Sequence, residues 1–193
     1  MAKRVLITVL TMVVVLVSCV VPACKGESEQ DQFSFGNGVT FGMSTAQVER
    51  LQGKPDYVTD EFMAYSGTSA GLDAITFYSF SGGLVDTIFV TFQEKHASNN
   101  RYIDDFDEVE TAMKAKYGTP FKDREETWSD TLFKGDKEGQ GLAIACEHLE
   151  ITSAWKIGDA LVSHSIRGDN YEIVHVIAYI HFGSKKEVDT SGI

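Results

Sequence analysis

The sequence predicts an α+β fold in which two helix-plus-antiparallel-strand units follow each other and share a core or a continuous sheet. Two short amphipathic helices end in matching Gly-x-Pro sequences, at 53–55 and 118–120, and β-branched and aromatic runs follow each helix. Apolar residues make up 43% of the 193 residues, enough for a substantial core. Because a unit of roughly 75 residues is only marginally stable, we expect the units 33–100 and 101–182 to form one domain, 33–182.

The first predicted helix carries local signals for its start and for its buried face. Ser44 and Gln47 have the spacing of a capping box, and Met43 and Val48 occupy the two positions of a hydrophobic staple. Val48 and Leu51 form a short apolar stripe. We therefore expect a helix of about two turns that begins after Ser44.

The second predicted helix runs from Asp104 or Asp105 to Tyr117. Asp105 and Glu108 have capping-box spacing, and the neighbouring acids lack the spacing of a calcium loop, so we expect all of them to serve the helix N-terminus. One face of this helix is apolar, with Phe106, Val109, Met113 and Tyr117.

Strands are predicted where β-branched and aromatic residues recur between turn residues. The predicted strands span 61–66, 74–80, 84–92, 125–133, 142–157, 160–166 and 171–182. A bulge or break near His148 interrupts the strand 142–157. Ser81-Gly82-Gly83 and Arg167-Gly168-Asp169-Asn170 are the predicted hairpin turns.

The N-terminus has the pattern of an export signal. A positively charged start and an apolar stretch lead to Leu16-Val17-Ser18-Cys19, which resembles the bacterial lipobox. This resemblance implies that residues 1–18 are removed as a lipoprotein signal peptide and that Cys19 becomes the lipid-modified N-terminus. Residues 19–32 then form a lipidated N-terminus and flexible tether, and residues 183–193 form a polar tail.

Three alternatives remain open at this terminus. Cys24 is a second candidate for the lipid, although Pro22 departs from the lipobox pattern. An uncleaved anchor at 5–21 is at the lower length limit for a membrane-spanning helix, and a plain secretory signal would leave no lipid. Each alternative places the folded part outside the cytoplasm.

The charge of the chain excludes one class of partner. The formal net charge is −11, and removal of residues 1–18 takes away Lys3 and Arg4, which changes it to −13. Such a chain repels phosphate backbones and anionic lipid headgroups, so we expect no nucleic-acid partner and contact with a membrane only through the lipid. The three cysteines are too few for a disulfide scaffold.

Gly42-Met43-Ser44, with Gln47-Val48, Gly53 and Pro55, resembles the GM(S/T)xxQVxxxxGxP signature of small outer-membrane lipoproteins of the SmpA–OmlA type. The doubled unit is also similar to the β-lactamase-inhibitor-protein fold, in which two such units lie in tandem and bind an enzyme through a sheet face. These resemblances imply an α+β fold and a binding role in the cell envelope. Lipoproteins of the SmpA–OmlA type support the machine that assembles β-barrels in the outer membrane. The resemblance does not imply that role for this chain, because the chain continues well beyond one such unit and its second helix lacks the signature.

The candidate chemistry centres on histidine and cysteine. A turn across Gly168 and Asp169 makes His164 and His175 diagonal neighbours on one sheet face, and Cys146, Glu147 and His148 precede them in the chain. This group is a possible zinc site or nucleophile pair, although no HExxH or CxxC spacing is present. The competing interpretations are strand histidines and a buried thiol, and a disulfide between Cys24 and Cys146 is a further alternative.

Other motifs have simpler explanations. The tripeptide Arg167-Gly168-Asp169 is of integrin-binding type, but its residues also suit a tight turn. The sequence contains no Walker loop, GxSxG motif or dinucleotide fingerprint. We therefore assign no catalytic, cofactor-binding or metal-binding residue and expect no cofactor.

These observations favour a membrane-tethered, non-enzymatic module that binds a cell-envelope protein. We expect it in the outer membrane facing the periplasm in a cell with two membranes, and otherwise on the outer face of the plasma membrane. The expected contact residues are strand aromatics, because aromatic anchors dominate interface energetics: Tyr78, Phe80, Tyr171 and Tyr179. Core packing is the competing interpretation for each of them, and it is favoured over contact for any single one. The alternatives are an envelope hydrolase or metal-dependent enzyme that uses His164, His175 and Cys146, and an inhibitor of a secreted enzyme.

Overall fold

The computed structural model describes residues 33–182, which form an α+β fold as the sequence predicts. The described helices are α2 (Thr45–Gln52), α3 (Asn100–Tyr117) and α4 (Gln140–Ala145). The described strands are β1 (Tyr57–Val58), β2 (Phe62–Ser69), β3 (Leu72–Ser81), β4 (Leu84–Phe92), β5 (Lys122–Trp128), β6 (Leu149–Ile157), β7 (Ala160–Asp169) and β8 (Glu172–His181).

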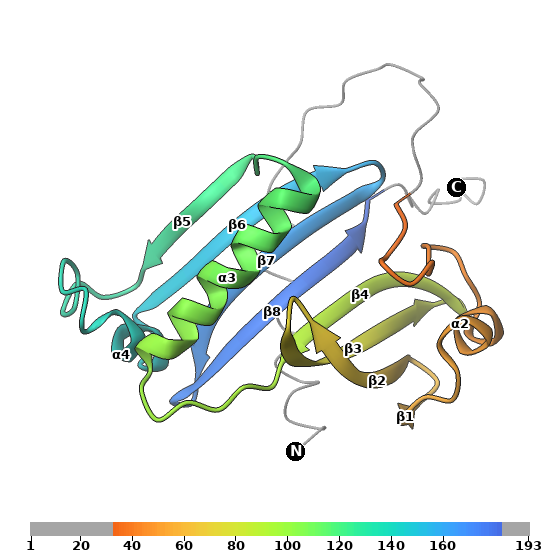
Figure 1. Cartoon of the computed structure of the whole chain (residues 1–193), viewed down its shortest axis with the longest axis horizontal. Helices are drawn as coiled ribbons and strands as arrows, with labels where there is room; N and C mark the ends of the chain where they lie inside the picture. The colour runs from red at the N-terminus through yellow and green to blue at the C-terminus, as the bar shows by residue number, and fades with distance from the viewer. Residues whose placement is uncertain (1–32, 183–193) are drawn as a thin grey trace, which may run out of the picture. The chain divides into compact units, whose positions relative to one another are not determined.

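All of these strands belong to one antiparallel sheet of eight strands (Figure 1). Their order is β1-β2-β3-β4-β8-β7-β6-β5. Strands β4 and β8 meet at the centre, where Thr87 lies opposite Ile180 and Thr91 opposite Val176. The expected continuous sheet is therefore present, and it joins the early strands of the chain to the late ones.

The described helices lie on the same face of the sheet. Helix α3 contacts β6, β7 and β8, and in Figure 1 it runs in front of β6 and β7, in nearly the direction of these strands. Val48 of α2 and Val109 of α3 belong to one core cluster with Trp155. Phe106 of α3 and Ile144 of α4 belong to a second cluster on that face. The apolar face predicted for the second helix is thus the face that α3 buries.

Helix α2 forms with its predicted start. The capping box of Ser44 and Gln47 is present, and the Gln47 side-chain oxygen accepts the Ser44 backbone N–H at 2.8 Å. Val48 is fully buried, and Gly53 ends the helix with φ 83°. The predicted partner of Val48 in the apolar stripe was wrong, because Leu51 is 49% exposed.

Helix α3 begins at Asn100, four residues before the earliest predicted start. The capping box of Asp105 and Glu108 was therefore wrong, since both residues lie inside the helix. Asp105 instead contacts the imidazole of His96 at 2.6 Å, and Asp107 pairs with Arg124 of β5. These acids bind side chains outside the helix rather than the helix N-terminus.

The predicted strands 142–157 and 125–133 also need correction. The apolar run before His148 forms α4, and β6 begins only at Leu149. Gly141 lets α4 approach α3 closely, because a Cβ at that position would overlap the backbone of Asn99 and Asn100. Strand β5 ends at Trp128, so residues 129–139 form a connecting segment instead of continuing the strand.

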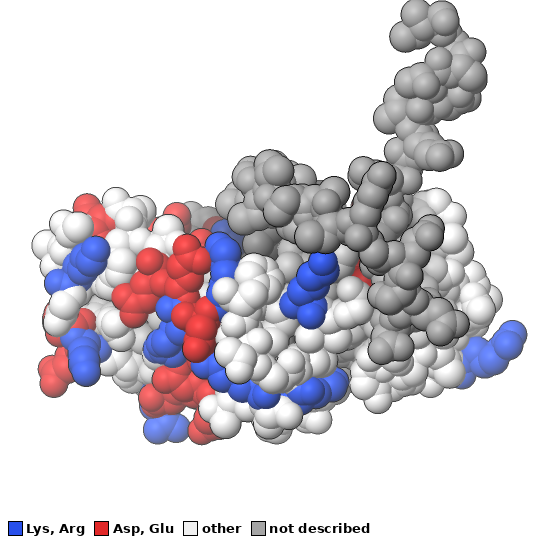
Figure 2. Space-filling view, turned by 90° about the horizontal axis from the view of Figure 1, so that it is seen from above, with Lys and Arg blue, Asp and Glu red and all other residues white. Residues whose placement is uncertain are grey.

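Both edges of the sheet are protected against the addition of another strand. Strand β5 is mostly charged and has an irregular register between Lys122 and Glu125, and both features discourage edge pairing. In Figure 2, acidic and basic side chains intermix on the half of the view that holds β5 and α3. At the other edge, the Asp56 carboxylate accepts the outward Ser66 backbone N–H at 2.6 Å.

Candidate binding surface

The hairpin between β7 and β8 ends in a tight two-residue turn. Asp169 lies opposite Glu172, so Asn170 and Tyr171 are the two turn residues. Both have positive φ, 51° for Asn170 and 65° for Tyr171. Positive φ at both positions is typical of a type I′ turn, which favours Asn at the first and Gly at the second. A tyrosine in the second position is therefore strained.

Packing of the Tyr171 side chain does not offset this backbone strain. It is 82% exposed, the most exposed of the large apolar side chains among residues 33–182. A second hairpin provides a comparison, since the turn between β2 and β3 has Ala70 at φ 51° and Gly71 at φ 87°. The same kind of turn thus holds the favoured glycine in one hairpin and an exposed aromatic residue in the other.

The β7–β8 turn rests firmly on α4. A Cβ at Gly168 would overlap the Ile144 carbonyl oxygen, so only glycine lets β7 pass this close to the end of the helix. The Asn170 backbone N–H donates to the Glu147 carboxylate at 2.9 Å. The turn is therefore fixed to the main body of the fold at two successive points.

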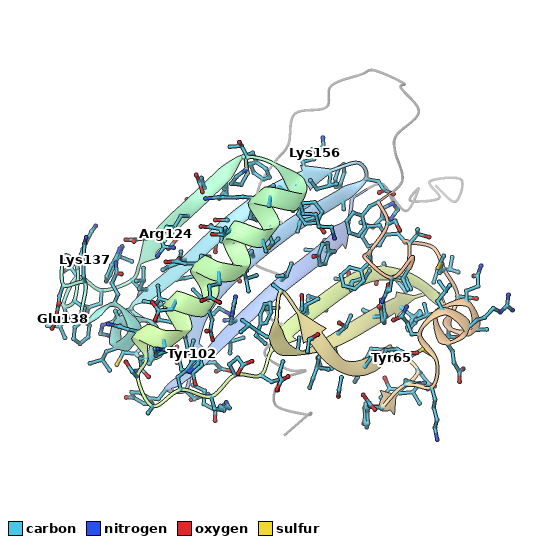
Figure 3. The ribbon with its side chains drawn as sticks, viewed as in Figure 1. Tyr65, Tyr102, Arg124, Lys137, Glu138 and Lys156 are labelled. Atoms are coloured by element: carbon cyan, nitrogen blue, oxygen red, sulfur yellow. The ribbon has the colours of Figure 1, made fainter. Side chains whose placement is uncertain are left out.

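Two further exposed apolar side chains lie at this end of the sheet. Leu142 of α4 is 45% exposed, and Leu132, in the segment before α4, is 73% exposed. That segment is attached to the same region, because the Ser129 hydroxyl donates to the Glu147 carbonyl at 2.8 Å. Figure 3 shows Lys137 and Glu138 of this segment at the end of the sheet near α4. We call Tyr171, Leu132 and Leu142 the hairpin-end surface.

Of the four aromatic residues predicted to contact a partner, only Tyr171 is exposed. Tyr78 and Tyr179 are almost completely buried in the core under the helices, and Phe80 is 9% exposed in the same cluster. The competing interpretation, core packing, therefore holds for these three. The segment before α2 covers the two tyrosines, since the Phe35 ring packs edge-on against both.

The opposite face of the sheet offers no exposed aromatic side chain at its centre either. Phe77 and Phe89 lie opposite each other on this face and are each 6% exposed. Ala178, next to Phe89 across the β4–β8 pair, is buried as well. The exposed apolar side chains named above thus come from connecting segments and α4.

The predicted pairing of His164 and His175 is confirmed. Their Nε2 atoms are 2.7 Å apart, and both side chains are buried. The register differs from the expected one by four residues along β8, since His164 lies opposite Ile177 instead of Ile173. A shift by an even number of residues keeps each side chain on the same face, so the two histidines remain diagonal neighbours.

The environment of this pair keeps both rings neutral. The His164 ring stacks on Phe106 at 4.0 Å and the His175 ring on Phe92 at 4.1 Å. Burial lowers the pKa of His175 to about 3. Burial, reinforced by His175 and then Arg124, holds the pKa of His164 well below its usual value. The pair therefore behaves as part of the core at neutral pH.

The other members of the predicted chemical group are placed elsewhere. Cys146 follows α4 as a half-buried free thiol, which corrects its expected place in a buried strand. Glu147 holds the β7–β8 turn, and the His148 ring packs against Phe133 at 5.8 Å. Within the described part of the chain, no three His, Cys, Asp or Glu side chains gather as a metal-binding group.

The turn predicted at Arg167-Gly168-Asp169-Asn170 was wrong in position. The first three of these residues belong to β7, and Gly168 is buried against α4. The integrin-type tripeptide is therefore part of a strand and not the tip of a loop.

Several predictions concern residues outside 33–182: the signal peptide 1–18, lipidation of Cys19 or Cys24, the tether 19–32 and the tail 183–193. Among the described residues, no helix has both the length and the apolar character needed to cross a membrane. The chain matches no known protein family, no curated protein and no solved structure.

Proposed function

We propose that this chain is an exported lipoprotein whose folded part binds a cell-envelope protein through the hairpin-end surface and carries out no catalysis. The observation that supports this proposal most strongly is Tyr171. It combines a strained backbone with an 82% exposed aromatic side chain. Strain that brings no packing is a feature of functional positions.

The surroundings of Tyr171 suit a binding role. Exposed aromatic residues provide large contact areas at interfaces and supply many of their energetic hot spots. Gly168 and Glu147 hold the turn in place, so binding would order little additional chain. Leu132 and Leu142 add exposed apolar area at the same end of the sheet, and the protected sheet edges disfavour binding by strand addition.

The enzymatic alternatives have less support. A hydrolase or zinc enzyme built on His164 and His175 needs a path from solvent to the two rings, whereas both are buried between aromatic side chains. Their lowered pKa values favour neutral, mutually hydrogen-bonded rings. A packing role for this pair needs no further assumption.

We also propose that the chain consists of two tandem units, 33–100 and 101–182, of the kind found in SmpA–OmlA-type lipoproteins and the β-lactamase-inhibitor-protein fold. The support is the strand order, in which β1 to β4 are followed by β8 to β5. Each half contributes four strands, and the last strand of each half lies at the centre. Inhibition of a secreted enzyme is a special case of the same binding function.

The lipid anchor is tested by palmitate labelling in bacterial cells that express the full chain. We expect label in the wild-type chain and in Cys24→Ala, and none in Cys19→Ala. The labelled chain should fractionate with membranes, in the outer membrane of a host that has one. Unlabelled full-length chain in the cytosol would contradict both the export and the anchor.

The binding surface is tested by photo-crosslinking in cells. A photoreactive amino acid replaces Tyr171 in one variant and Ala70 in the other, so that both probes lie in type I′ turns of the same sheet. We expect a discrete crosslinked envelope protein from position 171 and none from position 70. Equal crosslinking from the two turns would mean that the hairpin end has no specific partner.

A further inference from the structure

Carboxylates lie close to the backbone of two parts of the hairpin-end surface, at Leu132 and at the turn that carries Tyr171. The Asp130 carboxylate accepts the Leu132 backbone N–H at 2.7 Å, which fixes it at the backbone of that residue. The Glu147 carboxylate accepts the Asn170 N–H at 2.9 Å, one residue from Tyr171. Glu172 follows Tyr171 and is exposed. Tyr171 therefore projects from a turn that is flanked by two acidic residues, Glu147 and Glu172.

We infer that the partner presents an apolar pocket for Tyr171 that is bordered by lysine or arginine side chains. This inference rests on the proposed binding function and specifies its chemistry. Docking of Tyr171 in a pocket would bring Glu147 and Glu172 against the edge of that pocket. Acidic groups on the partner at that edge would be repelled, whereas basic groups would gain complementary contacts.

The net charge of the whole chain also favours a partner with basic side chains. The formal net charge, −11 for the full chain and −13 without residues 1–18, attracts cationic surfaces over distances of about a Debye length, roughly 8 Å at physiological salt. The surroundings of the hairpin-end surface are not uniformly acidic, because Lys134 and Lys137 lie in the segment that carries Leu132. These two exposed lysines provide control positions with the opposite sign.

The experiment measures the yield of the crosslink from position 171 in two charge-reversal variants. Glu172→Lys should lower the yield roughly three- to tenfold, and the loss should shrink as salt is raised. Lys134→Glu, a reversal at the same end of the sheet, should leave the yield unchanged or raise it. Melting curves of both variants verify that the fold is intact.

The site on the partner is then identified by sequencing the crosslinked peptide. We expect an apolar site with at least one lysine or arginine close to the crosslinked residue. A crosslink with an uncharged or acidic site, or a yield that is insensitive to Glu172→Lys and to salt, would overturn this inference but leave the binding function standing. Absence of any crosslink specific to position 171 would overturn both.

Discussion

Replacement of Tyr171 by glycine separates the effect of this residue on the stability of the fold from its role in binding a partner. Tyr171 has φ 65° and an 82% exposed side chain. Glycine adopts positive φ without a steric penalty, so Tyr171→Gly relieves the strain and removes almost no packing. The variant should therefore be more stable than the wild type and should lose the partner.

The size of the gain follows from two opposing effects. A left-handed conformation costs an L-residue roughly 1–2 kcal/mol. Glycine loses more backbone freedom on folding, which offsets about 0.5–1 kcal/mol of that relief. We therefore expect Tyr171→Gly to raise the free energy of unfolding by about 0.5–1 kcal/mol, or a few tenths of a molar in the urea midpoint.

The assay is urea unfolding of the mature chain carrying Cys19→Ala, with and without Tyr171→Gly. Gly71→Tyr is the matched control, because it places tyrosine at the equivalent position of the β2–β3 turn and should lower the free energy of unfolding by a similar amount. If Tyr171→Gly instead destabilised the chain by more than about 0.5 kcal/mol, Tyr171 would be a packing residue and the argument from strain would fail.

Three further outcomes are expected. Gly168→Ala should destabilise the chain by about 1–3 kcal/mol in urea unfolding, because its Cβ would overlap the Ile144 carbonyl, whereas Gly67→Ala, which meets no atom within 4 Å, should change stability little. Because the folded pKa of His175 is about 3 against an ordinary 6.5, the unfolded chain binds the extra proton. The free energy of unfolding should therefore fall as the pH drops below about 6.5, and this residue should account for roughly 2 kcal/mol of the loss at pH 5. In His175→Gln the free energy of unfolding should depend less steeply on pH, by that amount. An unchanged pH dependence in this variant would show that the His175 ring is already charged in the folded chain. Elemental analysis of the purified mature chain should find zinc far below one equivalent; stoichiometric zinc that is lost in His175→Ala would instead support the enzymatic alternative.

Local sequence signals predicted those elements whose residues interact mainly with one another. The start of α2 depends on contacts between Ser44 and Gln47, so spacing alone located it. The apolar face of α3 follows from periodicity, and Phe106 and Val109 are buried as expected. The histidine pair was found for a similar reason, because the alternation of side chains along β7 and β8 is preserved by a register shift of four residues.

Contacts between distant segments decided the features that sequence did not predict. Turn propensity favours Gly168 and Asp169 as a hairpin turn, but Gly168 is needed where β7 meets α4, and this moves the turn to Asn170 and Tyr171. The apolar run in α4 is short enough to suit a strand or a helix. Its helical state depends on Gly141 fitting against α3, which no local pattern reveals.

Leu132 and Leu142 of the hairpin-end surface were not predicted from the sequence, because their exposure also depends on contacts between distant segments. Leu132 was assigned to a strand and Leu142 to a buried run, so neither was expected to be exposed. Both became recognisable only from the structure, in which Glu147 binds the segment before α4 through its carbonyl and the β7–β8 turn through its carboxylate. A leucine carries no sequence signal that separates core packing from binding.

Photo-crosslinking from position 142 tests most directly whether the hairpin end is one binding surface. A photoreactive amino acid at Leu142 should capture the same envelope protein as one at position 171. That product should disappear when Tyr171→Gly is added, although α4 and its probe are unchanged. Capture of a different protein from position 142, or a yield unaffected by Tyr171→Gly, would show that Tyr171 and α4 do not bind a common partner.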